Sequence, residues 1–328
     1  MPNTPKTTGR LKSKKRLTAF ILVPVLGIGG ILYGLADRYL IEHVEVVVDQ
    51  NKAASENAAA PQAETLPDAT ANESGATSDD WNYESDAVKI HIDQIQEGSG
   101  SDQITYFVAD VQMKDSTALQ SAFAENSFGR NITQATSEIA ESHGAVFAVN
   151  GDYYGFREDG VIIRNGTLYR DEPARTGLAL FQDGTMEAYD EQEVTSESLL
   201  ERGVTQTLSF GPALIQGGQV NTDLDSVKID TNFGNRSIQG ANPRTGIGLI
   251  APNHYVFVVV DGRKEGYSQG MTLTELAQVF EDLGCTEAYN LDGGGSSTMY
   301  FKGRVVNNPQ GKGRERGVSD ILYVSEGN

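Results

Sequence analysis

The feature that most constrains this chain is an uncharged run of 20 residues near its start, Leu17–Ala36 (LTAFILVPVLGIGGILYGLA). At a rise of about 1.5 Å per residue, a helix of this length spans about 30 Å, the thickness of the hydrocarbon core of a bilayer. The sequence therefore predicts a transmembrane helix over residues 17–36, with the lipid bilayer as its partner. A buried core helix and a cleaved signal peptide are the alternatives. However, a core helix is rarely apolar on all sides, and a signal peptide has a shorter apolar region that ends at a small-residue cleavage site.

The charges on the two sides of this run differ. Residues 1–16 contain six lysines and arginines and no acid, whereas acids and bases are mixed after Ala36. Because positive charge favours the cytoplasmic side of a membrane, we expect a single-pass signal anchor in the cell membrane. Residues 1–16 would form a cytoplasmic basic tail, and everything after the helix would lie outside the cytoplasm. A short basic tail before a single anchor indicates a bacterial envelope protein.

The remainder of the chain is strongly acidic. The whole chain has a net charge of -19, so the part that follows the basic tail carries -25. Nucleic-acid binding depends on clustered cations that displace counterions from phosphates, and we therefore expect no nucleic-acid partner. Cys285 is the only cysteine, which excludes an intramolecular disulfide. The four histidines are scattered, which argues against a multi-histidine metal site.

Two segments follow the predicted anchor. Residues 37–85 are expected to form an acidic, low-complexity linker, since residues 50–80 are rich in Ala, Ser, Thr, Glu, Asp and Pro and contain Leu66 as their only large aliphatic residue. Such a composition cannot bury enough apolar surface to offset the entropy lost on ordering, so the linker is predicted to be a disordered tether. From residue 86 to residue 328, short apolar runs alternate with Gly and Asp turns, which predicts a single domain rich in strands.

Four apolar runs in this domain predict strands: residues 88–92, 104–109, 145–149 and 255–260. The last two are continuous β-branched and aromatic runs, typical of strands buried on both faces. One helix is predicted from Thr272, because Thr272 and Glu275 form a capping box before an apolar helical pattern, and Gly284 suits the position after the helix. A further strand over 285–291 completes a βαβ-like unit. We therefore expect an α+β fold, a single mixed-sheet catalytic domain with few helices.

Polar residues follow two strands of that unit. Asp261 comes directly after the strand 255–260, and the segment NLDGGGSST (290–298) follows the next strand. If the two strands are parallel neighbours, Asp261 and Asp292 leave the sheet at the same edge, where open sheets bind ligands. Three successive glycines allow backbone N–H groups to converge on an anion, and the serines add hydroxyl donors. The alternative is a glycine-rich turn capped by Asp and Ser.

A third strand end carries Asn150 and Asp152, followed by Tyr153 and Tyr154. These tyrosines would form either a platform for a sugar or part of the core. Arg244 and Arg316 each lie just before an apolar strand. A guanidinium group can bind a phosphate with two hydrogen bonds, although a surface ion pair explains either arginine alone.

Seven short blocks of the sequence resemble the phosphodiester glycosidase family, in the order in which that family has them. They are NGDYY (150–154), SFGPA (209–213), NPRTG (242–246), VDGR (260–263), GMTL (270–273), NLDGGGSST (290–298) and ERGVS (315–319). The resemblance implies a hydrolase that cleaves the bond between a sugar's anomeric carbon and a phosphodiester oxygen. It also implies one cleft lined by catalytic and substrate-binding residues. The catalytic candidates are Asp292, Asp261 and Asp152, and the substrate-binding candidates are Asn150, Gly151, Arg244, Asn290, Gly293, Gly294, Gly295, Ser296, Ser297 and Arg316.

A mechanism follows as a hypothesis. Arg244, Arg316 and the backbone of residues 293–297 would hold the phosphate, while Asp292 or Asp261 acts as nucleophile or as base for water, with Asp152 as the next candidate. The three aspartates also leave room for a divalent cation, Ca²⁺ or Mg²⁺, although no EF-hand spacing is present. The expected substrate is a phosphate-containing glycan, such as an envelope glycopolymer or exopolysaccharide. The alternatives are a metal-dependent phosphodiesterase or phosphotransferase that attacks phosphorus, and a non-catalytic glycopolymer-binding module.

Overall fold

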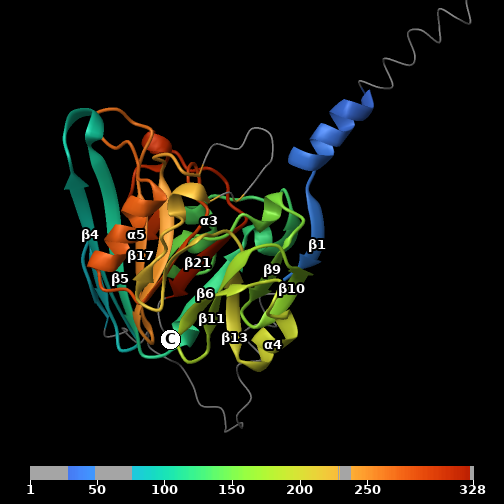
Figure 1. Cartoon of the computed structure of the whole chain (residues 1–328), viewed down its shortest axis with the longest axis horizontal. Coiled ribbons are helices and arrows are strands. Elements are labelled where there is room, and N and C mark those ends of the chain that lie inside the picture. Colours follow the sequence, from blue (N-terminus) through green and yellow to red (C-terminus); the bar gives the residue numbers. More distant parts are fainter. Residues whose placement is uncertain (1–28, 49–75, 228, 230–237, 326–328) are drawn as a thin grey trace, which may run out of the picture. The chain divides into compact units, whose positions relative to one another are not determined.

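A computed structural model describes residues 29–48, 76–227, 229 and 238–325 of the chain (Figure 1). It divides into two units, Met1–His43 and Val44–Asn328. The described part of the first unit is helical over residues 29–39. Within the described ranges, no helix combines the length and the apolar character needed to cross a bilayer. The basic tail and residues 17–28 of the predicted span lie outside those ranges, so the transmembrane helix stays a prediction.

Two antiparallel sheets dominate the second unit. The larger has nine strands in the order β15-β14-β18-β16-β17-β5-β4-β3-β2, and the smaller has five in the order β20-β19-β8-β21-β6. The strands of the larger sheet are β2 (Thr77–Ser78), β3 (Asn82–Glu84), β4 (Val88–Glu97), β5 (Ile104–Met113), β14 (Ala213–Gln216), β15 (Gln219–Val220), β16 (Arg244–Ala251), β17 (His254–Val260) and β18 (Glu287–Asn290). Those of the smaller sheet are β6 (Leu119–Phe123), β8 (Ala145–Asn150), β19 (Met299–Phe301), β20 (Arg304–Val305) and β21 (Asp320–Ser325).

Smaller sheets and three helices complete the described domain, in agreement with an α+β fold with few helices. The expected single mixed sheet is instead a pair of main sheets in which the described strand pairs are antiparallel. The remaining strands are β1 (His43–Val47) with β7 (Ser127–Arg130), β9 (Gly160–Arg164) with β10 (Thr167–Glu172), and β11 (Thr176–Phe181) between β12 (Met186–Asp190) and β13 (Val204–Leu208). The helices are α3 (Thr136–Ser142), α4 (Ser196–Glu201) and α5 (Leu273–Asp282).

The two main sheets pack face to face, and each carries a helix on its outer face. In β17, Phe257 faces the five-stranded sheet and contacts Phe147 of β8 with ring centroids 5.2 Å apart, whereas its neighbour Val258 belongs to the core beneath α5. On the other sheet, Ile321 of β21 packs with Ile139 of α3. Strands buried on both faces explain the continuous apolar runs in the sequence. Figure 1 shows α5 beside β5 and β17 at one side of the domain, and β9, β11 and α4 at the other.

The predicted helix is confirmed in its start, its buried face and its end. Thr272 is the N-cap of α5 and forms the capping box with Glu275, while Gly284 follows the helix with a φ of 78°. Phe280 fills the interface between α5 and the sheet with 0% exposure. Cys285 is buried next to this helix end, and its burial raises the pKa of the thiol to about 12. A thiol of this kind is an inert packing residue.

The ordered domain begins earlier than residue 86. Strands β2 and β3 extend the nine-stranded sheet, Tyr83 is 4% exposed, and Trp81 stacks on Phe107 with ring centroids 6.4 Å apart. Strand β1 pairs with β7, and the second unit already starts at Val44. Both ends of the predicted linker 37–85 therefore contribute strands, and Trp81 and Tyr83 join the second end to the core of the nine-stranded sheet. Residues 49–75 lie outside the described residues.

Candidate active site

The ends of the two main sheets meet at Asp292. Strands β17 and β18 are parallel but not neighbours, since β16 lies between them and pairs with both, Arg244 opposite Val260 and Gly246 opposite Asn290. Asp261 and Asp292 therefore leave the sheet at the same edge, as expected. From the five-stranded sheet, the Asn150 amide donates a hydrogen bond of 2.6 Å to the Asp292 carbonyl. This bond joins the end of β8 to the loop that follows β18.

The Asp292 side chain uses one of its two oxygens within the protein. Oδ2 accepts hydrogen bonds from Ser296 Oγ at 2.6 Å and from Arg316 Nη2 at 2.9 Å. Oδ1 accepts none from any described residue. The Asp292 side chain is 11% exposed and that of Arg316 is 43% exposed, so this ion pair lies at the surface end of a buried loop. A carboxylate oxygen without a protein partner at such a place is available to a substrate.

Burial controls the ionisation of this carboxyl. Burial raises the pKa of Asp292, and the positive charge of Arg316 and the hydrogen bond from Ser296 only partly oppose it. The positive charge of Arg157 also lowers this pKa, and the negative charge of Asp152 raises it. Catalytic sites often contain a carboxyl group of this kind, which has a raised pKa and pairs with a partly exposed cation.

Asp152 belongs to a buried ionic cluster beside this loop. Its two oxygens accept hydrogen bonds from the backbone N–H groups of Tyr153 and Ser209, each at 2.6 Å. Arg164 Nη2 lies 3.7 Å from Asp152 Oδ2 and 2.7 Å from Asp320 Oδ2, and both ion pairs are almost completely buried. Burial raises the pKa of Asp320 to about 6 against the lowering effect of Arg164. Asp152 thus holds two backbone segments in place and has no oxygen left over.

Gly151 fits against this cluster because it has no side chain. A Cβ atom at Gly151 would lie 2.4 Å from Asp320 Oδ1, and the Asp320 carboxylate accepts a hydrogen bond of 2.8 Å from the Asp152 N–H. The substrate-binding role predicted for Gly151 is therefore replaced by a packing role, in which the glycine lets a buried carboxylate approach the turn after β8.

Asp261 has a structural environment instead of the catalytic one expected from the sequence. Its carboxylate accepts hydrogen bonds from Tyr267 Oη at 2.7 Å, from Asn307 Nδ2 at 2.8 Å and from the Asn308 N–H at 2.9 and 3.0 Å. Burial raises its pKa despite these donors. A 1% exposed carboxylate with both oxygens occupied holds two loops together and has no position for a substrate.

The side chain of Arg244 is held mainly by backbone carbonyls. Its guanidinium donates to the carbonyls of Met271 at 2.9 Å, Ile238 at 2.5 Å and Gly240 at 2.7 Å. Burial lowers the pKa of Arg244 to about 10, and the nearby charge of Arg263 adds to this effect. Backbone carbonyls thus hold Nε and Nη2 of Arg244, and these bonds order the loop before β16. Nη1 donates to no described residue, so the phosphate-binding role of Arg244 stays a prediction.

Some backbone N–H groups of the glycine run after Asp292 form no hydrogen bond within the described protein. The N–H of Gly294 donates to the Pro243 carbonyl at 2.8 Å and that of Ser296 to the Gly293 carbonyl at 3.2 Å. The N–H groups of Gly293, Gly295 and Ser297 donate to no described residue. Gly294 has a φ of 64°, and a Cβ there would lie 2.9 Å from Arg263 Nη2. Arg316 contacts the same run, since a Cβ at Gly295 would lie 3.1 Å from its Cδ. Two arginine side chains therefore flank the run.

Several buried polar atoms of the same segment lack protein partners. Asn290 Oδ1, Ser297 Oγ and Thr298 Oγ1 are buried and accept or donate no hydrogen bond among the described residues. Buried polar groups are nearly always hydrogen-bonded, to protein, water or ligand. All three atoms lie between the end of β18 and the start of β19, next to Asp292.

An aromatic group borders the carboxylates. The Arg157 guanidinium lies 5.0 Å from the ring centroids of both Tyr153 and Phe210, and its Nη1 donates to the Ser209 carbonyl at 2.9 Å. Tyr153 is partly exposed, but Phe156 stacks on its ring with centroids 4.8 Å apart, so its ring packs against the protein. Tyr154 is 2% exposed and stacks on Phe128 with ring centroids 5.1 Å apart, which makes it a core residue.

The candidate metal site finds no support in the geometry. Among the described residues, no group of three or more His, Cys, Asp or Glu side chains could hold a metal ion. Asp152 and Asp261 each have both oxygens bonded to protein donors.

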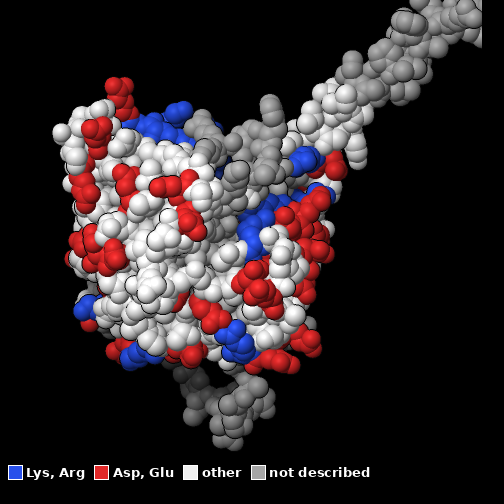
Figure 2. All heavy atoms as spheres, in the orientation of Figure 1, with Lys and Arg blue, Asp and Glu red and all other residues white. Residues whose placement is uncertain are grey.

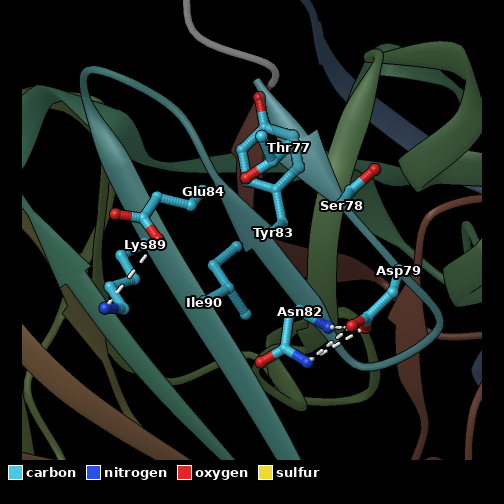
Figure 3. Close-up of a pocket in the computed structure, with 8 residues that line it drawn as sticks. All are labelled: Thr77, Ser78, Asp79, Asn82, Tyr83, Glu84, Lys89 and Ile90. Carbon is cyan, nitrogen blue, oxygen red and sulfur yellow. Dashed lines mark hydrogen bonds and ion pairs between the residues drawn. The ribbon is translucent and has the colours of Figure 1, made fainter. Parts of the chain in front are cut away.

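The groove shown in Figure 3 is separate from these residues. It lies on the outer strands β2, β3 and β4 of the nine-stranded sheet, where Asp79 binds Asn82 and Lys89 pairs with Glu84 at 3.8 Å. None of the residues predicted to line the cleft belongs to it. Both of its carboxylates have protein partners.

Comparison with known proteins decides the family. The model of the phosphodiester glycosidase family matches residues 143–325, more than half of the chain. The chain belongs to the phosphodiester glycosidase family. Among curated relatives, the chain is 32% identical over 207 residues to the uncharacterized protein YomE, derived from the SPbeta prophage of Bacillus subtilis (strain 168). The match covers 60% of this chain and 30% of YomE. It is 26% identical over 209 residues to N-acetylglucosamine-1-phosphodiester alpha-N-acetylglucosaminidase of Bos taurus, covering 58% of this chain and 38% of the bovine protein. The matches thus span about a third of these relatives.

A solved structure has a similar fold. The catalytic domain of zebrafish N-acetylglucosamine-1-phosphodiester alpha-N-acetylglucosaminidase, auto-inhibited by its pro-peptide, superposes with a TM-score of 0.59 at 20% identity. The match covers 74% of this chain and 85% of the zebrafish chain. The sheet-rich arrangement with few helices is therefore shared with that catalytic domain.

Sequence reasoning missed three residues of the site region. Arg263 lies in the VDGR block, where a role was predicted for Asp261 alone. The Arg263 side chain reaches Gly294. Arg164 and Asp320 form the buried ion pair behind Asp152. Arg164 ends the apolar run Val161–Arg164, and Asp320 begins the apolar run Asp320–Val324. A charged residue at the end of such a run is the signal that could have identified a buried ion pair.

Proposed function

We propose that this chain hydrolyses glycosyl phosphodiesters, cleaving the bond between the anomeric carbon of a sugar and the phosphate oxygen. The Asp292 carboxylate acts at the anomeric carbon, as a nucleophile or by activating water, while cationic and N–H groups bind the phosphate. Support comes from membership of the phosphodiester glycosidase family and from the site around Asp292.

The observation that carries this proposal is the unoccupied Oδ1 of Asp292. Asp152, Asp261 and Asp320 have both oxygens bonded to protein donors, whereas both protein bonds of Asp292 go to Oδ2. Because Oδ2 is held by Ser296 and Arg316, the carboxylate has a fixed orientation with its other oxygen available. A carboxylate oriented in this way suits attack on a carbon that develops positive charge.

The phosphate is held beside this carboxylate. Arg316 and Arg263 flank the glycine run, and the N–H groups of Gly293, Gly295 and Ser297 are unused by the described protein. Groups of this kind stabilise the negative charge that grows on the phosphate as the bond breaks. A phosphate is already a weak base, so the leaving group needs little help from a general acid.

The test is hydrolysis of sugar-1-phosphodiesters in ¹⁸O-labelled water, with the full chain and with an Asp292→Asn variant. We expect label in the sugar and not in the phosphate, and loss of turnover in Asp292→Asn with an unchanged circular dichroism spectrum. The matched control is Asp93→Asn, which removes a carboxylate with 62% side-chain exposure and should leave turnover intact. Label in the phosphate would mean attack on phosphorus. Wild-type turnover in Asp292→Asn would overturn the role of this residue.

The location is a second part of the proposal. We infer that residues 17–36 anchor the chain in the cell membrane and that the domain acts outside the cytoplasm on an envelope glycopolymer or exopolysaccharide. The uncharged run and the basic tail before it support this inference. Protease added to intact spheroplasts should digest the domain and leave a short protected fragment. A domain that resists protease until the membrane is ruptured would contradict this orientation.

A further inference from the structure

Five cationic side chains are exposed on two loops beside the candidate active site. The loop after β17 carries Arg263 and Lys264, and the loop before β21 carries Lys312, Arg314 and Arg316. The chain after residue 16 has a net charge of -25, so a group of five cations is unusual on this surface. In Figure 2, blue spheres gather along the upper edge of the domain, while red spheres predominate over much of the rest of the visible face. We call these five residues the basic rim.

The fold brings the two loops together. A Cβ at Gly311 would lie 2.7 Å from Lys264 Cβ and 3.1 Å from the Gly262 carbonyl, so the loops are in contact. Asp261 reinforces this contact, because its carboxylate at the start of one loop accepts the N–H of Asn308 at the start of the other. The basic rim is therefore a continuous feature of the surface, although its members lie about fifty residues apart in the sequence.

Acidic side chains do little to neutralise Lys312 and Arg314 of the basic rim, whereas Arg316 pairs with Asp292. Glu315 points away from it, since its carboxylate accepts hydrogen bonds from the N–H of Ser137 at 3.0 Å and from the hydroxyl of the same residue. Asp261 is buried. Glu265 is the remaining acid of the two loops and is exposed. Within the described parts of the chain, Lys312 and Arg314 form no ion pair.

One end of the basic rim belongs to the candidate active site. Arg316 pairs with Asp292, and Arg263 reaches Gly294 of the glycine run. A substrate with one phosphodiester carries one negative charge, which these two arginines suffice to bind. Lys264, Lys312 and Arg314 extend the positive surface beyond that point, where only additional negative charges of a longer substrate could use them.

We propose that the basic rim binds successive phosphates of a polyanionic, phosphodiester-linked glycan whose terminal or internal glycosyl phosphate lies at Asp292. This inference rests on the proposed function and names its substrate as a polymer with repeating charge instead of a single sugar phosphate. The positive surface is continuous with the phosphate site, which favours the substrate polymer over an unrelated anion. Cations along a polyanion contribute through release of counterions, so their effect falls as salt concentration rises.

The test compares two substrates with the same sugar, one with a single phosphodiester and one a linear poly(glycosyl phosphate). The variant is Lys312→Gln with Arg314→Gln, which leaves Asp292 and its partner untouched. We expect kcat/KM for the polymer to fall about tenfold at low salt, and the slope of log kcat/KM against log salt to shrink by about 1 to 2. The single phosphodiester should be hydrolysed within about twofold of the wild-type rate.

A matched control removes two exposed lysines at the other end of the same sheet. Lys89 and Lys114 lie at the end of β4 and β5 where Val88 pairs with Met113, whereas Tyr106 pairs with Val260 at the end near the site. Lys89→Gln with Lys114→Gln lowers the net charge equally and should leave polymer hydrolysis unchanged. Equal losses in the two double variants would show a general charge effect and overturn the basic rim.

A binding measurement distinguishes failure of the basic-rim proposal from failure of the proposed hydrolase function. Affinity for the intact polymer is measured by fluorescence anisotropy with the Asp292→Asn chain, with and without the two rim substitutions. If the wild type cleaves neither substrate while the rim substitutions weaken polymer binding about tenfold, the hydrolase proposal fails and the rim stands. If the wild type cleaves both substrates and the rim variant cleaves them equally well, the rim proposal fails. The rim proposal also fails if the two rim substitutions weaken binding to duplex DNA or to anionic lipid vesicles but do not weaken binding to the polymer.

Discussion

Replacing Arg316 by methionine tests the electrostatic account of Asp292. Arg316 Nη2 lies 2.9 Å from Asp292 Oδ2 and favours the charged form of a carboxyl whose pKa is raised by burial. Methionine retains much of the aliphatic stem and removes the charge. The pKa of Asp292 should therefore rise further, because burial would act with less opposition.

The size of this change follows from the geometry. Two unit charges whose centres are about 4 Å apart interact by about 4 kcal/mol at an effective dielectric constant near 20 and by about 1 kcal/mol in water. The Arg316 side chain is 43% exposed, so solvent screening reduces the interaction toward the lower end, about 1 to 2 kcal/mol. Since 1.36 kcal/mol corresponds to one unit, the pKa of Asp292 should rise by about one unit.

The assay is the pH profile of kcat/KM for a single sugar-1-phosphodiester, which reports ionisation in the free enzyme. The proposed role needs the carboxylate form of Asp292, so activity is lost as the pH falls through its pKa. The acid limb of the Arg316→Met profile should therefore lie about one pH unit higher than that of the wild type, whatever the loss in maximal rate. High salt should shift the wild-type limb in the same direction.

Arg202→Met is the matched control, because Arg202 has a similar exposure of 42%, pairs with Glu187 at 2.5 Å and lies on the α4 side of the domain. Its acid limb should coincide with that of the wild type. An unmoved acid limb in Arg316→Met, or a limb moved to lower pH, would refute the assignment of that limb to Asp292. A shift confined to the alkaline limb would mean that Asp292 acts in its protonated form.

Three further predictions concern stability and are checked by urea denaturation. Asp320→Asn should lower the free energy of unfolding by about 3 to 5 kcal/mol at neutral pH, because it leaves the fully buried Arg164 without its closest counter-charge; a loss under 1 kcal/mol would contradict a buried ion pair. Gly248→Ala should be destabilising by about 1 to 3 kcal/mol, since the added Cβ would lie 2.6 Å from Phe280 Cδ1 beneath α5; an unchanged midpoint would show that α5 can move. Thr272→Ala should cost about 1 kcal/mol through loss of the helix N-cap, and no change would mean that the cap contributes little.

The local features of the fold could be predicted from the sequence because nearby residues determine them. Thr272 caps α5 within its own turn, and the apolar run of β17 carries alternate residues for two cores. The pairing of the strands could not be predicted in the same way. Nothing in the segments near Val260 and Asn290 indicated that β16 lies between their strands, because sheet order depends on contacts between distant segments.

For the site residues, too, local features could be predicted from the sequence and contacts between distant segments could not. The NLDGGGSST block predicted a loop whose N–H groups remain available, and the structure has such a loop, since its conformation depends on residues adjacent in sequence. The carbonyls that hold Arg244 could not be predicted, because the direction of a long side chain depends on the segments that surround it, here those of Met271, Ile238 and Gly240. Asp261 was misplaced because its donors come from Asn307 and Asn308, more than forty residues away.

The hydrogen bonds of the four buried aspartates differ in a way that bears on the proposed role of Asp292. Asp320 and Asp152 are held by Arg164 and by backbone N–H groups, and Asp261 is held by four bonds, so their negative charges stabilise specific loops at the cost of desolvation. Asp292 has the same burial cost, but one of its oxygens receives no bond in return. A buried group that the protein leaves partly unsatisfied lowers stability and gains its missing interaction only when a substrate or water arrives. Because the three satisfied aspartates fix the loops around it, Asp292 can keep this unsatisfied oxygen in one orientation, which is the arrangement that chemistry at an anomeric carbon needs.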